Sequence, residues 1–361
     1  MSGSQGKHVV YWIGAGASAQ ALPVVNEMPA AFRSQQVWVR NLMKDRLEAY
    51  FFKDYVEKLY AYALLCERFG TIDTYARSLF ILKKREELSE LKLHLALFFL
   101  LEQAVERRSY QRVQVPAPDI YEKKEQIDTR YMTWLAQLLD SEGLIKPCVQ
   151  VLSWNYDLQL EHAVGVYRGL EDLSEVHDTA AFWFYPDPEQ LDMGGFTRPA
   201  VIHLNGIAGQ AMGSRGARAL YRGLVAADPE AYILDLFKHY AEVRKGNARA
   251  LRAMDRTFCF AWEENSITEK GVSFACDAME RADVLVIIGY SFPAFNRTID
   301  MRLMHAFIPR NTVNKDKRIH FQSRSHTEAS FGHIFGISQE STNIKVDSYV
   351  DQFYLPPELF N

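Results

Sequence analysis

The chain has 361 residues, of which 48% are hydrophobic and 24% charged, and its formal net charge is −4. These proportions are typical of a globular protein with a sizeable core, and they exclude a disordered or fibrous chain. The charge excludes an overall basic field, so we expect neither direct nucleic-acid binding nor attachment to a membrane.

Apolar stretches and cysteines indicate the cellular setting. The longest apolar stretch, Leu95 to Leu101, is far too short to span a bilayer, and the first residues do not form a signal peptide. The four cysteines stand singly, without the paired spacing of a zinc or redox site. We therefore expect a cytoplasmic protein with reduced thiols and no bound metal.

Six short runs are apolar, rich in β-branched residues and without strict alternation: Val9–Ile13, Val149–Ser153, Val201–Leu204, Val284–Gly289, Ile319–Gln322 and Ile344–Val346. Such runs predict strands of a parallel sheet that is covered on both faces. A helical pattern leads directly into the fourth run, as in a βαβ unit. We predict an α/β fold with a Rossmann-like parallel sheet of about six strands.

Two long segments interrupt this sheet. Apolar residues recur at steps of three and four between Met43 and Tyr62 and over residues 87–108, so residues 31–144 predict a helical insertion. Residues 206–282 carry several glycines and a helical pattern, and they predict a second, mixed insertion. The sheet domain then comprises residues 1–30 and 145–361, with the second insertion inside it.

The first strand runs into "GAGASA", in which Gly14, Gly16 and Ala19 match the spacing GxGxxG/A. Between a strand and a helix, this spacing lets backbone N–H groups approach a phosphate. A tight turn without a ligand is the alternative. The acidic residue that a dinucleotide-binding fold places about 20 residues later has no counterpart, because the chain turns helical there.

Polar residues follow three further strands. The second strand ends in "SWNYD", where Asn155 and Asp157 are either ligand-binding residues or caps of the next helix. The third gives "VIHLNG", in which alternation would put His203 and Asn205 on one face, before Gly206. A buried structural histidine is the alternative.

The fourth strand ends in "GYSFP", where Gly289 allows close approach and Ser291 offers a hydroxyl for a ribose or phosphate. Its alternative is an ordinary Gly-Ser-Pro turn. Since the carboxyl ends of parallel strands meet at one edge of a sheet, we expect all four strand ends to form a single ligand site.

Taken in order, "GAGAS", "WNYD", a strand with His or Asn before Gly, and "IGYSFP" resemble the sirtuin-like NAD-binding fold. The pattern is most similar to sirtuin-like NAD hydrolases of bacterial anti-phage defence, and "TIDTYARSLF" at 71–80 also resembles a segment of those effectors. The resemblance covers roughly residues 8–30 and 145–348, and not the insertions.

The resemblance implies an enzyme that hydrolyses NAD+ to nicotinamide and ADP-ribose, with NAD as substrate and no metal. It implies that Asn155 orients the nicotinamide ribose and the attacking water, while Asp157 faces the nicotinamide. Gly14, Ala15, Gly16 and Ser18 would line the pyrophosphate and ribose, and Gly289 and Ser291 the adenosine side. Asn205 and Gly206 are further expected cofactor-binding residues.

One position departs from the family pattern. The family's general base is a histidine directly before glycine, and Asn205 stands there, before Gly206. Either His203 replaces that base in a regulated defence effector, or the chain is a non-catalytic NAD or ADP-ribose sensor or regulatory subunit. The chain lacks the four-cysteine zinc module of protein-deacylating sirtuins, which argues against a deacylase. We expect a homo-oligomer or a defence partner protein, with the helical insertion serving oligomerisation or gating.

Overall fold

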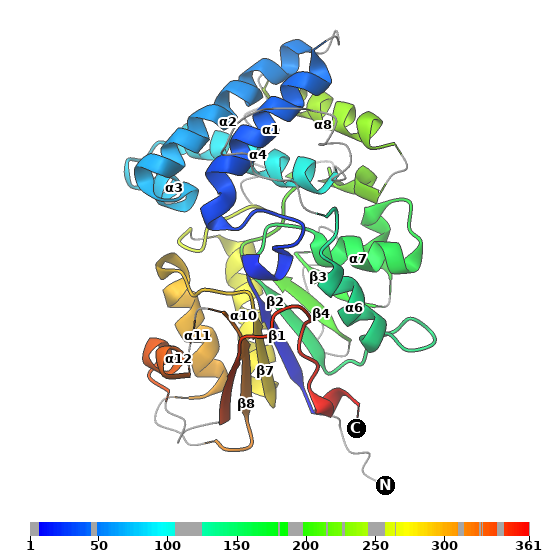
Figure 1. Ribbon diagram of the computed structural model, residues 1–361, viewed down its shortest axis with the longest axis vertical. Coiled ribbons are helices and arrows are strands. Elements are labelled where there is room, and N and C mark those ends of the chain that lie inside the picture. The colour runs from blue at the N-terminus through cyan, green and yellow to red at the C-terminus, as the bar shows by residue number, and fades with distance from the viewer. Residues whose placement is uncertain are drawn as a thin grey trace.

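The computed structural model shows an α/β protein built on a single large parallel sheet (Figure 1). It describes residues 7–44, 49–104, 125–179, 181–186, 198–213, 216–225, 228–244, 257–263, 265–309, 314–324, 326, 328–337 and 343–360. Among these, no helix is long and apolar enough to cross a membrane.

Seven parallel strands form the main sheet in the spatial order β3-β4-β2-β1-β7-β8-β9. Their bounds are β1 Val9–Ile13, β2 Val149–Ser153, β3 Trp183–Tyr185, β4 Ala200–His203, β7 Val284–Ile288, β8 Arg318–Gln322 and β9 Asn343–Asp347. The predicted parallel sheet is confirmed, and each of the six predicted runs contributes one strand. The addition is β3, whose three residues are too few to produce a recognisable sequence pattern.

The sheet is covered on both faces, as its apolar strands require. In the central strand β1, Val9, Tyr11 and Ile13 face one core, and Val10 and Trp12 face the other. The first core contains side chains of α6 (Thr129–Leu138) and α7 (Gln159–Arg168). The second contains side chains of α10 (Ser266–Arg281), α11 (Arg297–Phe307) and α12 (Glu328–Phe335). Figure 1 shows these two helical layers flanking the strands.

A third group of helices lies beyond the carboxyl ends of the strands, at the top of Figure 1. It comprises α1 (Met28–Met43), α2 (Ala49–Phe69), α3 (Ile72–Ile81), α4 (Arg85–Ala104) and α8 (Pro229–Arg244). Their buried side chains belong to the same core as the α6–α7 face, so this helical layer is packed onto the sheet domain. Residues 105–108 of the predicted helical run lie outside the described residues.

Both predicted insertions contribute to this layer. Residues 31–144 include most of α1 and all of α2 to α4. However, α6 from the same segment packs on the sheet, where Trp134 makes an edge contact with Tyr11. Residues 206–282 include α8, α10 and a small antiparallel hairpin, β5 (Gln210–Gly213) with β6 (Gly216–Ala219). Short 3-10 turns complete the described elements: Ala15–Ser18, Val25–Glu27, Leu173–Asp178, Arg222–Val225, Ala294–Asn296 and Pro357–Leu359.

Candidate functional site

A cavity of about 590 Å³ lies between the carboxyl ends of the central strands and the helical layer. Segments that follow β1, β2, β4 and β7 line its floor, and Met28, Thr71 and Phe99 of the helical layer line its roof. The chain leaves β1 for β2 on one side and reaches β7 on the other, so the strand order reverses at this point. Open α/β sheets bind their ligands in the crevice at such a switch point.

The turn after β1 packs directly against the turn after β7. The N–H of Gly14 donates to the carbonyl of Ile288 at 3.0 Å, and the N–H of Gly16 donates to the carbonyl of Gly289 at 2.8 Å. A Cβ on Gly16 would lie 2.7 Å from the Cα of Gly289, and one on Gly289 would lie 2.2 Å from the nitrogen of Ala17. The glycines are therefore required because two backbones meet here.

This contact changes the expected role of the turn after β1, residues 14–18, which we call the glycine turn. The N–H groups of Gly14 and Gly16 already have carbonyl partners, so they are not free to bind a phosphate. Both residues still line the cavity, together with Ala15 and Ser18. The structure thus supports the tight-turn explanation of the spacing, while the surface of the turn faces the cavity.

Arg130 of α6 stabilises the glycine turn through hydrogen bonds to its backbone carbonyls. Its Nη2 donates to the carbonyls of Gly16 and Ala17 at 2.9 and 3.2 Å, and also to Asp128 Oδ2 at 2.6 Å. Asp128 in turn accepts the N–H of Gln20 at 2.9 Å. A buried ion pair from the segment predicted as an insertion therefore fixes the shape of one cavity wall.

Asn155 connects the turn after β2 to the glycine turn. Its Nδ2 donates to the carbonyl of Gly14 at 3.1 Å and to the Ser18 hydroxyl at 3.2 Å. These two bonds fix which way the amide points. Its Oδ1 accepts no hydrogen bond from the described residues, and Asn155 lines the cavity, so a carbonyl-type acceptor is available to a ligand.

Asp157 is buried at the same end of the cavity. Burial raises the pKa of its carboxyl from 3.8 to about 6, although hydrogen bonds from the N–H of Gln159 and from Ser18 act in the opposite direction. Its Oδ1 accepts the N–H of Gln159 at 3.1 Å, at the start of α7. Asp157 thus binds the first N–H of α7 from one residue before the N-cap, Leu158, and also lines the cavity.

His203 does not reach the cavity. It is the last residue of β4, and its Nε2 donates to Glu161 Oε1 of α7 at 2.8 Å, while its Nδ1 lies 3.3 Å from the carbonyl of Asn155. Burial lowers the pKa of His203, but Glu161, the carbonyl of Asn155 and the charge of Asp157 together outweigh burial, and the pKa is raised. Both ring nitrogens face acceptors of the protein, Glu161 Oε1 and the carbonyl of Asn155, so the ring is not placed to take a proton from a water bound in the cavity.

The expectation that His203 and Asn205 share a face is wrong. Because β4 ends at His203, the strand alternation does not continue to Asn205, which lies in the following turn and lines the cavity. Gly206, like His203, is not one of the residues that line the cavity. Its φ is +75°, and a Cβ there would lie 1.9 Å from the carbonyl oxygen of Thr257, so this glycine serves a backbone contact.

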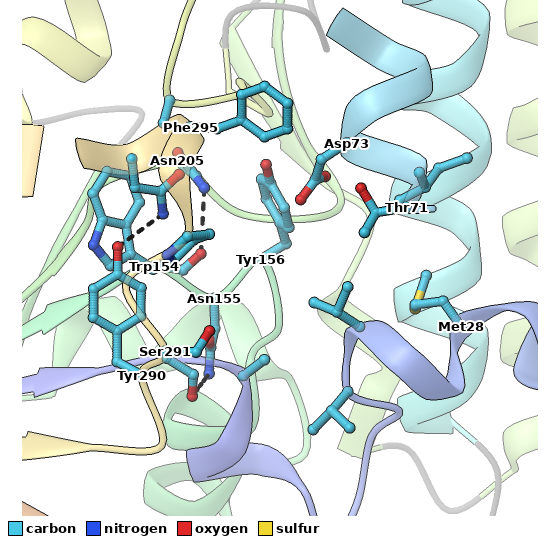
Figure 2. Close-up of a pocket in the computed structure, with 18 of the residues that line it drawn as sticks. Met28, Thr71, Asp73, Trp154, Asn155, Tyr156, Asn205, Tyr290, Ser291 and Phe295 are labelled. Carbon is cyan, nitrogen blue, oxygen red and sulfur yellow. Dashed lines mark hydrogen bonds between the residues drawn. The ribbon is translucent and has the colours of Figure 1, made fainter. Parts of the chain in front are cut away.

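Asn205 is only 6% exposed, yet its Oδ1 has no hydrogen-bond partner among the described residues. Its Nδ2 donates to the carbonyl of Trp154 at 3.4 Å, as Figure 2 shows. A buried acceptor without a partner is costly. Its position in the cavity lining makes a ligand the natural partner.

The helical layer supplies a second carboxyl that the site prediction missed. Asp73, in the first turn of α3, lines the cavity and points toward Tyr156 in Figure 2. Burial raises the pKa of Asp73 to about 6. Burial also raises the pKa of Tyr156, and the charge of Asp73 adds to that rise. Its signal in the sequence was the segment "TIDTYARSLF", which carried a resemblance but no predicted role.

Aromatic side chains form another wall of the cavity. The rings of Trp154 and Tyr290 are stacked, with centroids 6.1 Å apart, and both line the cavity beside Ser291. Behind them Asp300 of α11 accepts hydrogen bonds from Trp154 Nε1 at 3.2 Å and from the Tyr290 hydroxyl at 2.8 Å. Burial raises the pKa of Asp300 to about 8. This buried acid fixes the orientation of the aromatic wall.

The fold and site define an α/β protein with a ligand cavity at the switch point of a parallel sheet, lined by amides, carboxyls and aromatic rings. Of the predicted site residues, the structure brings Gly14, Ala15, Gly16, Ser18, Asn155, Asp157, Asn205, Gly289 and Ser291 to one cavity. No protein-family model matches the chain, and a search of curated proteins finds no match.

Proposed function

We propose that this protein binds NAD+ in the cavity and hydrolyses it to nicotinamide and ADP-ribose. The observation that carries the proposal is the convergence of Asn155 and Asp157 with the glycine turn at the switch point of the sheet. The order of motifs that resembles sirtuin-like NAD hydrolases supports NAD+ as the dinucleotide.

The chemistry needs few groups. The nicotinamide of NAD+ is a pyridinium, so it leaves as a neutral molecule without help from a general acid. Positive charge then develops on the ribose, as in glycoside hydrolysis. The carboxylates of Asp157 and Asp73 and the Oδ1 of Asn155 are the negative and dipolar groups that stabilise such charge.

A carboxylate takes the place of the imidazole as proton acceptor in this proposal. With pKa values raised to about 6, Asp157 and Asp73 are mostly ionised at neutral pH yet more basic than ordinary carboxylates. One of them accepts the proton of the water that attacks the ribose. A positioned general base is typically worth about 10²–10⁴-fold in rate.

A second candidate is a non-catalytic sensor of NAD or an ADP-ribose derivative. The observation in its favour is that Asn205 stands in the cavity while the only nearby imidazole, among the described residues, is tied to Glu161. An amide cannot accept the proton of water, so binding without turnover is the outcome if neither carboxylate acts as the base.

For the hydrolase we also propose a regulated role in anti-phage defence, in the cytoplasm, as a homo-oligomer or with a partner protein. An enzyme that depletes NAD+ must be restrained in a healthy cell. The helical layer roofs the cavity, and it is therefore the element through which assembly would control access.

Nicotinamide release from NAD+ by the purified protein tests the proposal. We expect Asn155→Ala and Asp157→Asn to lower the rate at least about 10²-fold, and His203→Ala to act chiefly on stability. Asn314→Ala is the matched control, because Asn314 lies in the loop before β8 and accepts only local backbone N–H groups. Release that survives Asn155→Ala would overturn the site assignment, and NAD+ binding without release would support the sensor.

A further inference from the structure

Asn205 stands where the resembling family has its base histidine, and the geometry of its amide indicates a role of its own. Its Nδ2 faces the carbonyl of Trp154, which can only accept, so the amide is oriented with Oδ1 on the other side. That Oδ1 is buried and unpartnered among the described residues, in a side chain that lines the cavity. Buried acceptors in folded proteins almost always have a donor, so this one is available to a donor from the ligand.

The surroundings of Asn205 restrict the chemistry of that donor. The carbonyl that holds it belongs to the peptide bond between Trp154 and Asn155, so Asn205 lies at the Asn155 end of the cavity. The flat rings of Trp154 and Tyr290 line the same cavity, and Figure 2 shows Asn205 beside Trp154. A planar ring that carries an N–H donor fits an aromatic wall next to a fixed acceptor.

The charges in the cavity also favour a ligand group that donates hydrogen bonds and carries no negative charge. Asp157 and Asp73 both line it, and both are mostly ionised at neutral pH with pKa values of about 6. A ligand group with a carboxylate would face two like charges and an amide oxygen that can only accept. A neutral carboxamide instead offers two N–H donors.

We propose that Asn205 is a specificity-determining residue whose Oδ1 accepts an N–H of the nicotinamide carboxamide, so that the site selects NAD+ over its deamidated analogue, nicotinic acid adenine dinucleotide. This inference rests on the proposed NAD+ binding. It gives the asparagine at the expected base position a recognition role of its own.

Binding of both dinucleotides is measured by stopped-flow tryptophan fluorescence, which records binding before any turnover, since Trp154 and Trp262 line the cavity. We expect the wild-type protein to bind NAD+ at least about tenfold more tightly than the deamidated analogue. Asn205→Ala removes the acceptor and should bring the two affinities within about threefold of each other. Asn205→Asp keeps an acceptor oxygen and should preserve or increase the preference, while Asn314→Ala should leave it unchanged.

The possible outcomes distinguish the role of Asn205 from the proposed binding of NAD+ itself. Equal binding of the two dinucleotides by the wild type, or a preference that persists in folded Asn205→Ala, overturns the role of Asn205 and leaves NAD+ binding intact. Binding of neither dinucleotide by the wild type overturns the proposed function and this inference with it. Thermal unfolding of each variant establishes that it is folded.

Discussion

At the level of single residues, Asp300 is buried behind the aromatic wall. It accepts hydrogen bonds from Trp154 and Tyr290, and its pKa is raised. Its folded-state pKa of about 8 lies above the ordinary value of 3.8, so between these pH values the folded protein holds a proton that the unfolded chain releases. Its contribution therefore makes the folded protein less stable as pH rises from about 4 to 8, by about 1.4 kcal/mol per pH unit at most.

Asp300→Asn removes this titration but keeps an acceptor for Trp154 and Tyr290. We expect the melting temperature of the variant, relative to wild type, to rise between pH 5 and pH 8 and to level off above pH 8. Differential scanning fluorimetry across that range measures it. Asp157 and Asp73 titrate in both proteins and cancel in the difference. A difference that does not change with pH would contradict the raised pKa of Asp300.

At the scale of elements, the turns after β1 and β7 form one unit because their backbones touch. Gly289 has a φ of +61°, and its missing Cβ leaves room for the nitrogen of Ala17. Gly169, at the end of α7, has a nearly identical φ of +63°, but no atom of the described residues lies within 4 Å of an added Cβ there. Substituting these two glycines therefore distinguishes two costs. Gly169 tests the strain of a left-handed backbone alone, and Gly289 adds the clash of a new Cβ with the turn after β1.

We expect Gly169→Ala to cost about 1–2 kcal/mol of unfolding free energy, the ordinary penalty of the left-handed region. Gly289→Ala should cost several kcal/mol more, or prevent folding, because the added carbon would force the two turns apart. Urea unfolding monitored by circular dichroism compares them. Equal losses in the two variants would show that the turns separate without cost.

At the scale of the whole molecule, the helical layer and the second insertion meet over the cavity. Lys92 of α4 binds Glu263 Oε1 at 2.7 Å, with side chains only 4% and 14% exposed, and Glu263 Oε2 accepts the N–H of Phe260 at 2.8 Å. Phe260 stacks on Trp262, and both line the cavity. This ion pair therefore links the roof to one of the side walls.

Lys92→Met should destabilise the protein by about 3–5 kcal/mol, because it removes the ammonium group that lies 2.7 Å from a largely buried carboxylate. Adding Glu263→Gln should recover part of that loss, so the double variant should cost less than the sum of the single ones. Urea unfolding of the four proteins gives the coupling energy. A sum that is strictly additive would mean that the pair does not couple the two insertions.

Local residue patterns are enough to predict the sheet and the floor of the site. Strands buried on both faces need short apolar runs, and polar residues such as Asn155, Asp157 and Ser291 gather where those runs end. These local patterns are sufficient for the six long strands, but not for β3, which has only three residues. They also could not show that Gly14 and Gly16 serve a contact with Gly289, since 273 positions separate Gly16 from Gly289 in the chain (289 − 16).

The full set of groups that share the cavity follows from how distant segments pack. His203 pairs with Glu161 because α7 packs on its face of the sheet, whereas Asn205 lines the cavity because β4 ends before it, at His203. Asp73 joined the site because the helical layer packs over the strand ends. Such outcomes depend on packing between distant segments, which no local residue pattern encodes.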